Sequence, residues 1–118
     1  MNRRQIGSEY EKEAARYLEQ NGYVILARNF RCRIGEIDLV ASEGGGLVFV
    51  EVKYRKNRRN GLPEEAVSGK KMQTISRVAD YYRVRYRVPE SVPCRFDVIA
   101  VEGEEIRHYK DAFPYMGY

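Results

Sequence analysis

Residues 35–53 read GEIDLVASEGGGLVFVEVK, two apolar runs joined by a glycine-rich turn. Each run carries an acid where a buried strand would be apolar: Asp38 in the first and Glu51, thirteen residues later, in the second. Because strand side chains alternate between two faces, Glu51 and Lys53 project from the same side of their strand. We therefore expect two neighbouring strands that bring two carboxylates and an ammonium group together.

This set of side chains suits a divalent-metal site. Mg²⁺ prefers oxygen ligands and commonly takes one or two carboxylates, leaving its other positions to water and a substrate phosphate. Asp38 and Glu51 are the candidate ligands, and Mg²⁺ or Mn²⁺ is the candidate ion. Lys53 is the candidate for orienting or deprotonating an attacking water and for offsetting phosphoryl charge. The alternative is that Glu51 and Lys53 form an ordinary solvated ion pair, worth about 0–1 kcal/mol.

The length and composition indicate a single domain over residues 1–118. The chain has no apolar run of membrane-spanning length and begins with a charged segment, so we expect a cytoplasmic protein that does not contact a membrane. Cys32 and Cys94 have no close Cys or His neighbours in the sequence, which indicates neither a disulfide framework nor a zinc cluster. His108, the only histidine, lacks a partner cluster and is expected to be structural.

Positive charge is concentrated in the middle of a chain whose net charge is +4. Clustered cations favour a polyanionic partner, because phosphate contacts supply much of the affinity for nucleic acid. The candidate nucleic-acid contacts are Arg55, Lys56, Arg58, Arg59, Lys70 and Lys71. The tyrosines Tyr54, Tyr81, Tyr82 and Tyr86 can stack on unpaired bases. We expect DNA rather than RNA as the partner, and the alternative is a basic face that only keeps the protein in solution.

Residues 8–21 have a helical pattern, with a start that can lie a few residues earlier. Ser8 with Glu11 resembles a capping box, and Gly22 marks the end. The apolar face of this helix consists of Tyr10, Ala14, Ala15, Tyr17 and Leu18. Glu11 falls within that face, where a carboxylate is costly unless it is paired. Two interpretations stay open for Glu11: an acid that helps to shape the metal site, or the partner of Ser8 in the capping box.

Three strand-like segments follow, over residues 23–31, 35–41 and 47–55, and their short turns predict an antiparallel meander. Next come a basic, glycine-containing loop over residues 56–62 and a helix start at Pro63. Ser68 is the predicted cap of a helix from about Lys70 to Tyr86, with a buried stripe of Met72, Ile75, Val78, Ala79 and Tyr82. Lys71 falls inside that stripe, either pointing toward the acids or extending its ammonium group into solvent.

The last segments read as a strand over residues 94–101 and a short edge strand over residues 105–109. Arg95 and Asp97 face away from Phe96 and Val98, so Asp97 can pair with Arg95 or Lys71, or assist the site. We favour a structural role for Asp97. Together the segments predict an α/β fold in α-β-β-β-α-β order, with a mixed central sheet and flanking helices.

These residues resemble the restriction-endonuclease-like superfamily, whose active sites follow the PD-(D/E)XK pattern. More narrowly, the chain resembles the YraN-like family of small bacterial proteins, which is similar to archaeal Holliday junction resolvases. The resemblance extends from Gly7 to Phe113 and includes Asn21-Gly22-Tyr23, Gly35-Glu36-Ile37-Asp38-Leu39, Phe49-Val50-Glu51-Val52-Lys53, Lys71 and Arg95-Phe96-Asp97-Val98. Tyr10 departs from the glycine expected in the family, and Ile37 precedes Asp38 where the superfamily pattern has proline.

The resemblance implies a restriction-endonuclease-like fold in which Asp38 and Glu51 are metal ligands and Lys53 is the catalytic lysine. It also implies that Glu11 is the helical acid found in resolvase-like members. The leading hypothesis is a Mg²⁺-dependent endonuclease that hydrolyses phosphodiester bonds of DNA, including structured or branched DNA. A nucleic-acid-binding or DNA-repair accessory module on a nuclease scaffold is the alternative, and a structural partner of another nuclease or helicase is a third hypothesis. Because junction cleavage benefits from two sites, we expect a homodimer.

Overall fold

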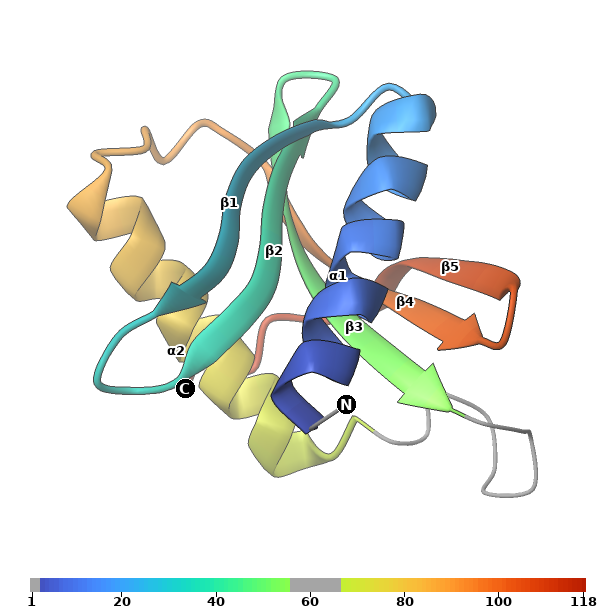
Figure 1. The fold of residues 1–118 in the computed structure, drawn as a ribbon. Coiled ribbons are helices and arrows are strands. Elements are labelled where there is room, and N and C mark those ends of the chain that lie inside the picture. The colour runs from blue at the N-terminus through green and yellow to red at the C-terminus, as the bar shows by residue number, and fades with distance from the viewer. Residues whose placement is uncertain (1–2, 56–66) are drawn as a thin grey trace.

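The computed structural model describes residues 3–55 and 67–118, and for residues 3–7 and 55 the backbone alone. Two helices and five strands make up this part of the chain (Figure 1). Their bounds are α1 (Arg3–Gln20), β1 (Val24–Arg31), β2 (Glu36–Glu43), β3 (Gly46–Arg55), α2 (Gly69–Arg85), β4 (Cys94–Glu102) and β5 (Glu105–Phe113).

The strands form one mixed sheet in the order β1-β2-β3-β4-β5. β1, β2 and β3 make the expected antiparallel meander, whereas β4 pairs with β3 in parallel, and β5 pairs with β4 antiparallel. A parallel neighbour needs a long crossover, which the segment containing α2 provides. The predicted α/β class and element order are therefore confirmed, and the edge strand expected over residues 105–109 is present as the longer β5.

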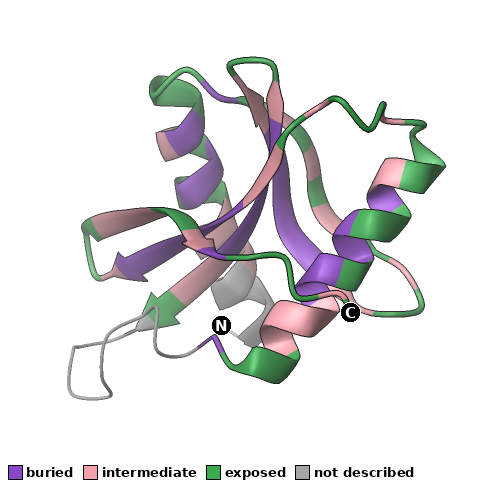
Figure 2. Cartoon of the chain, turned by 180° about the vertical axis from the view of Figure 1, so that it is seen from behind, coloured by how far each residue is buried: buried purple, intermediate pink, exposed green. Residues whose placement is uncertain are grey.

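Each helix covers one face of the sheet (Figure 1). Under α2 the buried side chains include Val40, Phe49, Val78 and Val98, and under α1 they include Leu18. Figure 2 shows the buried class concentrated along the central strands and on the sheet-facing sides of both helices. The central strands are buried on both faces because a helix covers each one. Three acids on these strands, Asp38, Glu51 and Asp97, therefore lie in the interior of the molecule.

The helix ends show where the sequence patterns were informative. α1 begins at Arg3, so Ser8 lies inside the helix and its interpretation as a helix cap is wrong. The other end agrees with prediction: Gly22 has φ +88°, and the N–H of Tyr23 donates to the carbonyl of Leu18 at 3.0 Å. Ser68 caps α2 as predicted, accepting a hydrogen bond from the N–H of Lys71 at 3.1 Å.

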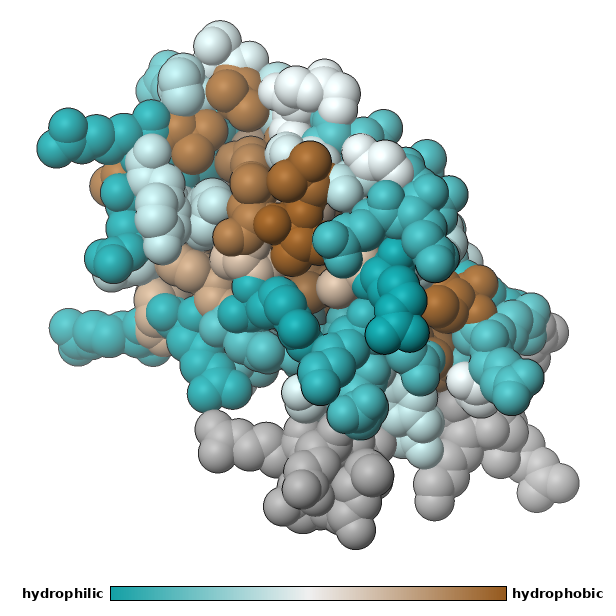
Figure 3. Space-filling model, turned by 45° about the horizontal axis from the view of Figure 1, so that its top comes forward, coloured by the Kyte–Doolittle hydropathy of each residue, from teal (hydrophilic) through white to brown (hydrophobic). Residues whose placement is uncertain are grey.

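The hairpin between β2 and β3 is tighter than the pattern suggests. β2 continues to Glu43, because only Gly44 and Gly45, with φ of +58° and +84°, form the turn. On the edge strand β1, Val24 and Leu26 are exposed. Figure 3 shows one face of the molecule, on which exposed apolar side chains gather near the middle and hydrophilic ones surround them. Over the described residues, neither helix is apolar enough over a sufficient length to cross a membrane.

Candidate metal centre and a second buried aspartate

The candidate site lies where β2 and β3 separate. Their ladder includes the pair Leu39–Val50, and one residue further along the strands stand Asp38 and Glu51. There the Asp38 Oδ2 accepts a hydrogen bond from the N–H of Val52 at 2.8 Å. Figure 1 shows the two strands separating toward the end of the sheet at which both helices begin. The carboxylate thus occupies a gap between the two strands.

Glu51 is 6% exposed and lies on the α2 side of the sheet. Its Oε1 is 3.4 Å from Lys53 Nζ and 3.7 Å from Lys71 Nζ. Lys53 extends from the same strand, and Lys71 comes from the first turn of α2. Of the two interpretations left open for Lys71, the contact agrees with the one in which it points toward the acids, although its side chain stays 41% exposed. One carboxylate is thus contacted by two ammonium groups.

Asp38 has a surplus of negative charge around it. Burial raises its pKa most, and the neighbouring Glu51, with smaller effects from Glu11 and Glu36, adds to the shift. The N–H of Val52 opposes these effects but does not cancel them, and the pKa of Asp38 rises to about 8. A bound divalent cation would neutralise this charge, so the pair of carboxylates fits a metal ion of the Mg²⁺ type.

Glu11 lies beside this pair. Asn29 sits between the paired residues Arg28 and Phe30 of β1, has φ +54°, and hydrogen-bonds to Glu11 through its side chain. Burial raises the pKa of Glu11, and the Asn29 contact opposes that rise. Since Ser8 is inside α1, the capping-box explanation of Glu11 no longer holds. Glu11 remains near enough to Asp38 to raise its pKa.

The donor set is small. Within the described residues, no group of three or more His, Cys, Asp and Glu side chains is placed to hold a metal ion. Asp38 and Glu51 are thus a pair of carboxylates, and Mg²⁺ commonly takes one or two carboxylates and fills its other positions with water and substrate phosphate. Glu11 acts on this pair through its charge, which raises the pKa of Asp38.

The other residues singled out in the sequence lie away from the acidic pair or outside the described residues. Tyr10, where the resemblance led us to expect glycine, stacks on Tyr54 with ring centroids 4.0 Å apart. Lys70 is exposed at the start of α2. The side chain of Arg55, together with Lys56, Arg58 and Arg59, lies outside the described residues.

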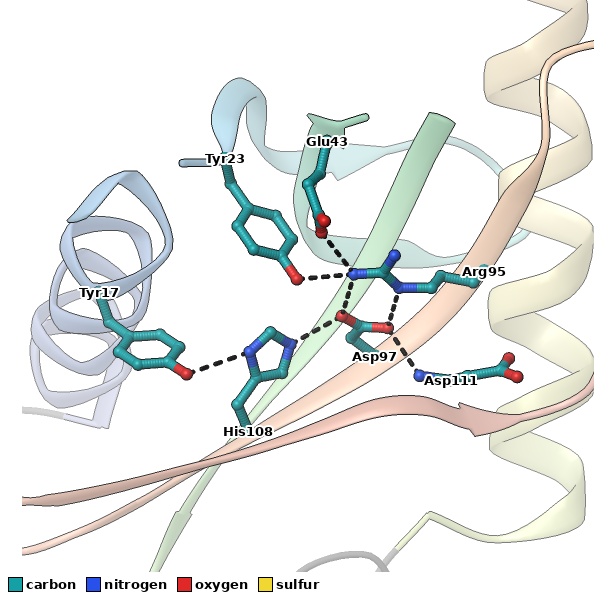
Figure 4. A network of polar contacts seen from close by, with 7 residues as sticks. All are labelled: Tyr17, Tyr23, Glu43, Arg95, Asp97, His108 and Asp111. Carbon is teal, nitrogen blue, oxygen red and sulfur yellow. Dashed lines mark hydrogen bonds and ion pairs between the residues drawn. The ribbon is translucent and has the colours of Figure 1, made fainter. Parts of the chain in front are cut away.

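A second buried aspartate, Asp97, lies on the opposite face of the sheet. Figure 4 shows its carboxylate between Arg95 and His108. Its Oδ1 accepts hydrogen bonds from Arg95 Nε at 3.0 Å and from the N–H of Asp111 at 2.9 Å, and its Oδ2 lies 2.7 Å from His108 Nε2. Arg95 also bonds to Tyr23 and Glu43, and His108 bonds to Tyr17. We call these residues the Asp97 network.

Of the alternatives left open for Asp97, the structure shows the pair with Arg95. His108, which has no partner cluster in the sequence, contacts Asp97 and Tyr17 in the fold. The β4–β5 pairing places His108 opposite Ile99, which shares a face with Asp97. The sequence offered Arg95 and Asp97 two residues apart as a signal. The contribution of His108 depends on the β4–β5 register, and the contribution of Tyr17 depends on how α1 packs. The local sequence pattern therefore predicts neither the contact of His108 nor that of Tyr17.

Comparison with known proteins places the chain among small bacterial relatives. A family model described as "Uncharacterised protein family UPF0102" matches residues 10–101. A UPF0102 protein of Lachnoclostridium phytofermentans is 56% identical over 117 residues, covering 99% of each chain. Another from Symbiobacterium thermophilum is 52% identical over 99 residues, covering 84% of this chain and 83% of its own. A third, from Legionella pneumophila, is 40% identical over 105 residues, covering 87% of this chain and 89% of its own.

Proposed function

This chain belongs to the uncharacterised protein family UPF0102, and on the chemistry of its acidic pair we propose that it is a metal-dependent endonuclease acting on DNA in the cytoplasm. The proposed reaction is hydrolysis of a phosphodiester bond with Mg²⁺ or Mn²⁺. The proposed scaffold is restriction-endonuclease-like. The proposed substrates include branched or otherwise structured DNA.

One observation carries the proposal: two buried carboxylates, Asp38 and Glu51, stand side by side at the gap between β2 and β3, and two lysines approach the second of them. An ordinary strand ion pair would be solvated. Here burial and the neighbouring Glu51 raise the pKa of Asp38 to about 8, a perturbation of the kind found at functional sites.

Asp38 and Glu51 would hold the ion. When bound, it supplies Lewis-acid polarisation of the phosphodiester and a more acidic water. The two lysines of the site have the remaining roles. Lys53, whose ammonium already reaches the site, orients the attacking water and stabilises charge on the phosphoryl oxygens. Lys71 stands beside the same carboxylate and positions the substrate phosphate from the N-terminal turn of α2, where the helix dipole also favours an anion.

The test is cleavage of duplex, single-stranded, flap and four-way junction DNA in Mg²⁺ or Mn²⁺. Asp38→Ala, Glu51→Ala and Lys53→Ala should each lower the rate by about 10²-fold or more, because each removes charge from the reacting centre. DNA binding should be largely unchanged. The exposed acid Glu104, replaced by Gln, is the matched control. Equal residual cleavage in all three alanine variants would reject the proposal.

A second candidate function is nucleic-acid binding without cleavage. The observation favouring it is that no third acid, histidine or cysteine completes a metal-binding group in the described residues. This function predicts salt-dependent binding that survives the acid-to-alanine changes and weakens when Arg55, Lys56, Arg58 and Arg59 are reversed to acids. A homodimer is proposed under the first function, since opposite strands of a junction need two sites. Sedimentation with and without junction DNA tests it.

A further inference from the structure

A cluster of aromatic side chains lies on the α2 face of the sheet, away from the metal centre. Phe30, near the end of β1, lies close to two tyrosines of α2 and to the tyrosine that follows the helix, with ring centroids 5.1 Å from Tyr82, 6.1 Å from Tyr81 and 6.3 Å from Tyr86. Tyr82 is buried and packs edge-on against Phe49 in the core at 5.7 Å. We call these four residues, Phe30, Tyr81, Tyr82 and Tyr86, the aromatic surface.

The outer part of this surface is open to solvent. Tyr81 is 43% exposed and Tyr86 is 54% exposed, although both rings are close to the partly buried Phe30. Val84, between them in the sequence, is 79% exposed. Because Tyr82 fixes the cluster to the core, the two exposed rings are held in place with little loss of freedom on binding. Rigid, exposed aromatic rings of this kind are suited to stacking on a planar partner.

The charge around the rings indicates what that partner is. Residues 77–87 read RVADYYRVRYR, four arginines and one acid. The Arg85 guanidinium lies 5.6 Å from the centre of the Tyr86 ring, and the acid, Asp80, accepts the hydroxyl of Tyr115. A second copy of this chain would bring like charges together, whereas a polyanion is attracted. Planar rings together with phosphates describe a nucleic acid whose bases are unpaired, since paired bases are stacked inside a duplex.

The distance between the aromatic surface and the acidic pair gives the length of strand that would connect them. Along α2 the distance from Lys71 to Tyr81 and Tyr86 is about 15 to 22 Å, at 1.5 Å per residue. The turn between β1 and β2 lies beside this path, because a Cβ placed on Gly35 would meet Thr74 Cγ2 at 2.8 Å. That turn also contributes exposed Arg33 and Ile34. At 3.4 Å per stacked nucleotide, the path corresponds to roughly four to seven nucleotides.

We propose that the aromatic surface stacks on unpaired bases of a DNA strand whose backbone lies at the acidic pair roughly four to seven nucleotides away. The inference rests on the proposed nucleic-acid substrate and narrows it to DNA with a single-stranded segment next to the cleaved bond. Tyr81 and Tyr86 are binding residues in this proposal. They contact bases and take no part in the chemistry.

The test measures binding, so that it does not depend on cleavage. The full-length protein in EDTA is titrated with fluorescent DNA that is either blunt duplex or duplex with a ten-nucleotide tail. Tyr81→Ala with Tyr86→Ala should weaken binding of the tailed DNA by about fivefold or more and binding of the blunt duplex by less than about twofold. Tyr81→Phe with Tyr86→Phe keeps both rings and should retain the parent affinity. Val84→Ala, on the same exposed helix, is a second control.

Three results would overturn the inference. The first is equal affinity of the parent protein for tailed and blunt DNA, and the second is a preference for tailed over blunt DNA that is unchanged in the double alanine variant. The third is loss of self-association in that variant, which would make the surface a dimer interface. Circular dichroism of each variant confirms folding. Failure of the nuclease proposal is a separate result: cleavage that survives Glu51→Ala would reject the acidic pair, while tail-dependent binding in EDTA would still support the aromatic surface.

Discussion

Asp38 and Asp97 are both buried in the same sheet, yet their surroundings act in opposite directions. Burial alone would raise the pKa of Asp97, but hydrogen bonds from His108, Arg95 and the Asp111 N–H lower it below the ordinary value. Asp38 accepts the N–H of Val52, and burial together with nearby acids raises its pKa to about 8. The fold offsets the cost of burying the Asp97 carboxylate, and it does not offset that cost at Asp38.

This difference separates a structural carboxylate from a functional one. Burying a charge is costly, and a fold recovers that cost when it supplies donors in good geometry, as it does around Asp97. At Asp38 the recovery is incomplete, so a ligand that brings positive charge gains free energy on binding. Burial identified both residues as unusual. The balance of donors and neighbouring acids identifies Asp38 as the candidate for chemistry.

The largest expected loss of stability on substitution is at Asp97, whose charge is balanced by hydrogen-bond donors. Asp97→Ala should lower the free energy of unfolding by about 3–5 kcal/mol, because it leaves Arg95 partly buried and removes the acceptor of His108. Urea denaturation at pH 7 measures it. Asp111 contributes only its backbone N–H to Asp97 and has φ +51°, which Asn also tolerates, so Asp111→Asn is the control and should change stability far less. A loss below about 1 kcal/mol for Asp97→Ala would remove the contrast between the two aspartates.

An effect of similar size is expected from Asp38, and its pH dependence has the opposite sign. A carboxyl group whose pKa is raised in the folded state destabilises the fold as pH rises from its unfolded value near 4 toward 8. In urea denaturation in EDTA at a series of pH values, the parent should therefore lose about 4–5 kcal/mol relative to Asp38→Asn over that range. For Asp97 the stabilisation is present above pH 4 and is lost in acid, as pH falls through its lowered pKa. Parallel pH profiles for the two variants would contradict this account.

Metal binding should remove part of the penalty at Asp38. At about one hundred times the dissociation constant, Mg²⁺ or Mn²⁺ should stabilise the parent by about 2.7 kcal/mol, seen as a higher melting temperature. Glu51→Gln should lose most of this gain, while Glu104→Gln, which changes an exposed acid, should keep it. Equal stabilisation of parent and Glu51→Gln by the metal would mean that the ion binds elsewhere.

The smallest effect is expected from the lysines. Lys71 is 41% exposed in its side chain, so its ion pair with Glu51 is screened by water. Lys71→Gln should change the free energy of unfolding by only about 0–1 kcal/mol, no more than Lys70→Gln on the neighbouring exposed position. Thermal unfolding in EDTA compares them. A large loss in Lys71→Gln alone would show that the acidic pair is held together structurally, as the Asp97 network is.

The central strands, both helices and the acidic pair were predictable because each depends on local pattern. The two-residue period of β3 assigns Glu51 and Lys53 to one face, and the stripe on α2 assigns Lys71 to the core side. The start of α1 was less predictable, since serine is a common helix cap and the helix nevertheless extends past Ser8 to Arg3. The preference of one residue for the cap position does not outweigh the tendency of the neighbouring residues to continue the helix.

The Asp97 network was not predictable in full because its members come from distant parts of the chain. Arg95 and Asp97 are neighbours in sequence, but Tyr17, Glu43 and His108 meet them only through the packing of α1 and the order of the strands. The register between β4 and β5 also includes an irregularity between Phe96 and Val98, beside Asp97 itself. A pattern of period two does not reveal such a shift.

The contact between Tyr17 and His108 joins residues 91 positions apart. β5 also supplies the N–H of Asp111 to Asp97, so a strand synthesised after β4 completes the contacts of a carboxylate on β4. Asp38, Glu51 and Lys53 are all synthesised earlier. A growing chain therefore carries its acidic pair and Arg95 before it carries His108 and Asp111, the partners that complete the contacts of Asp97.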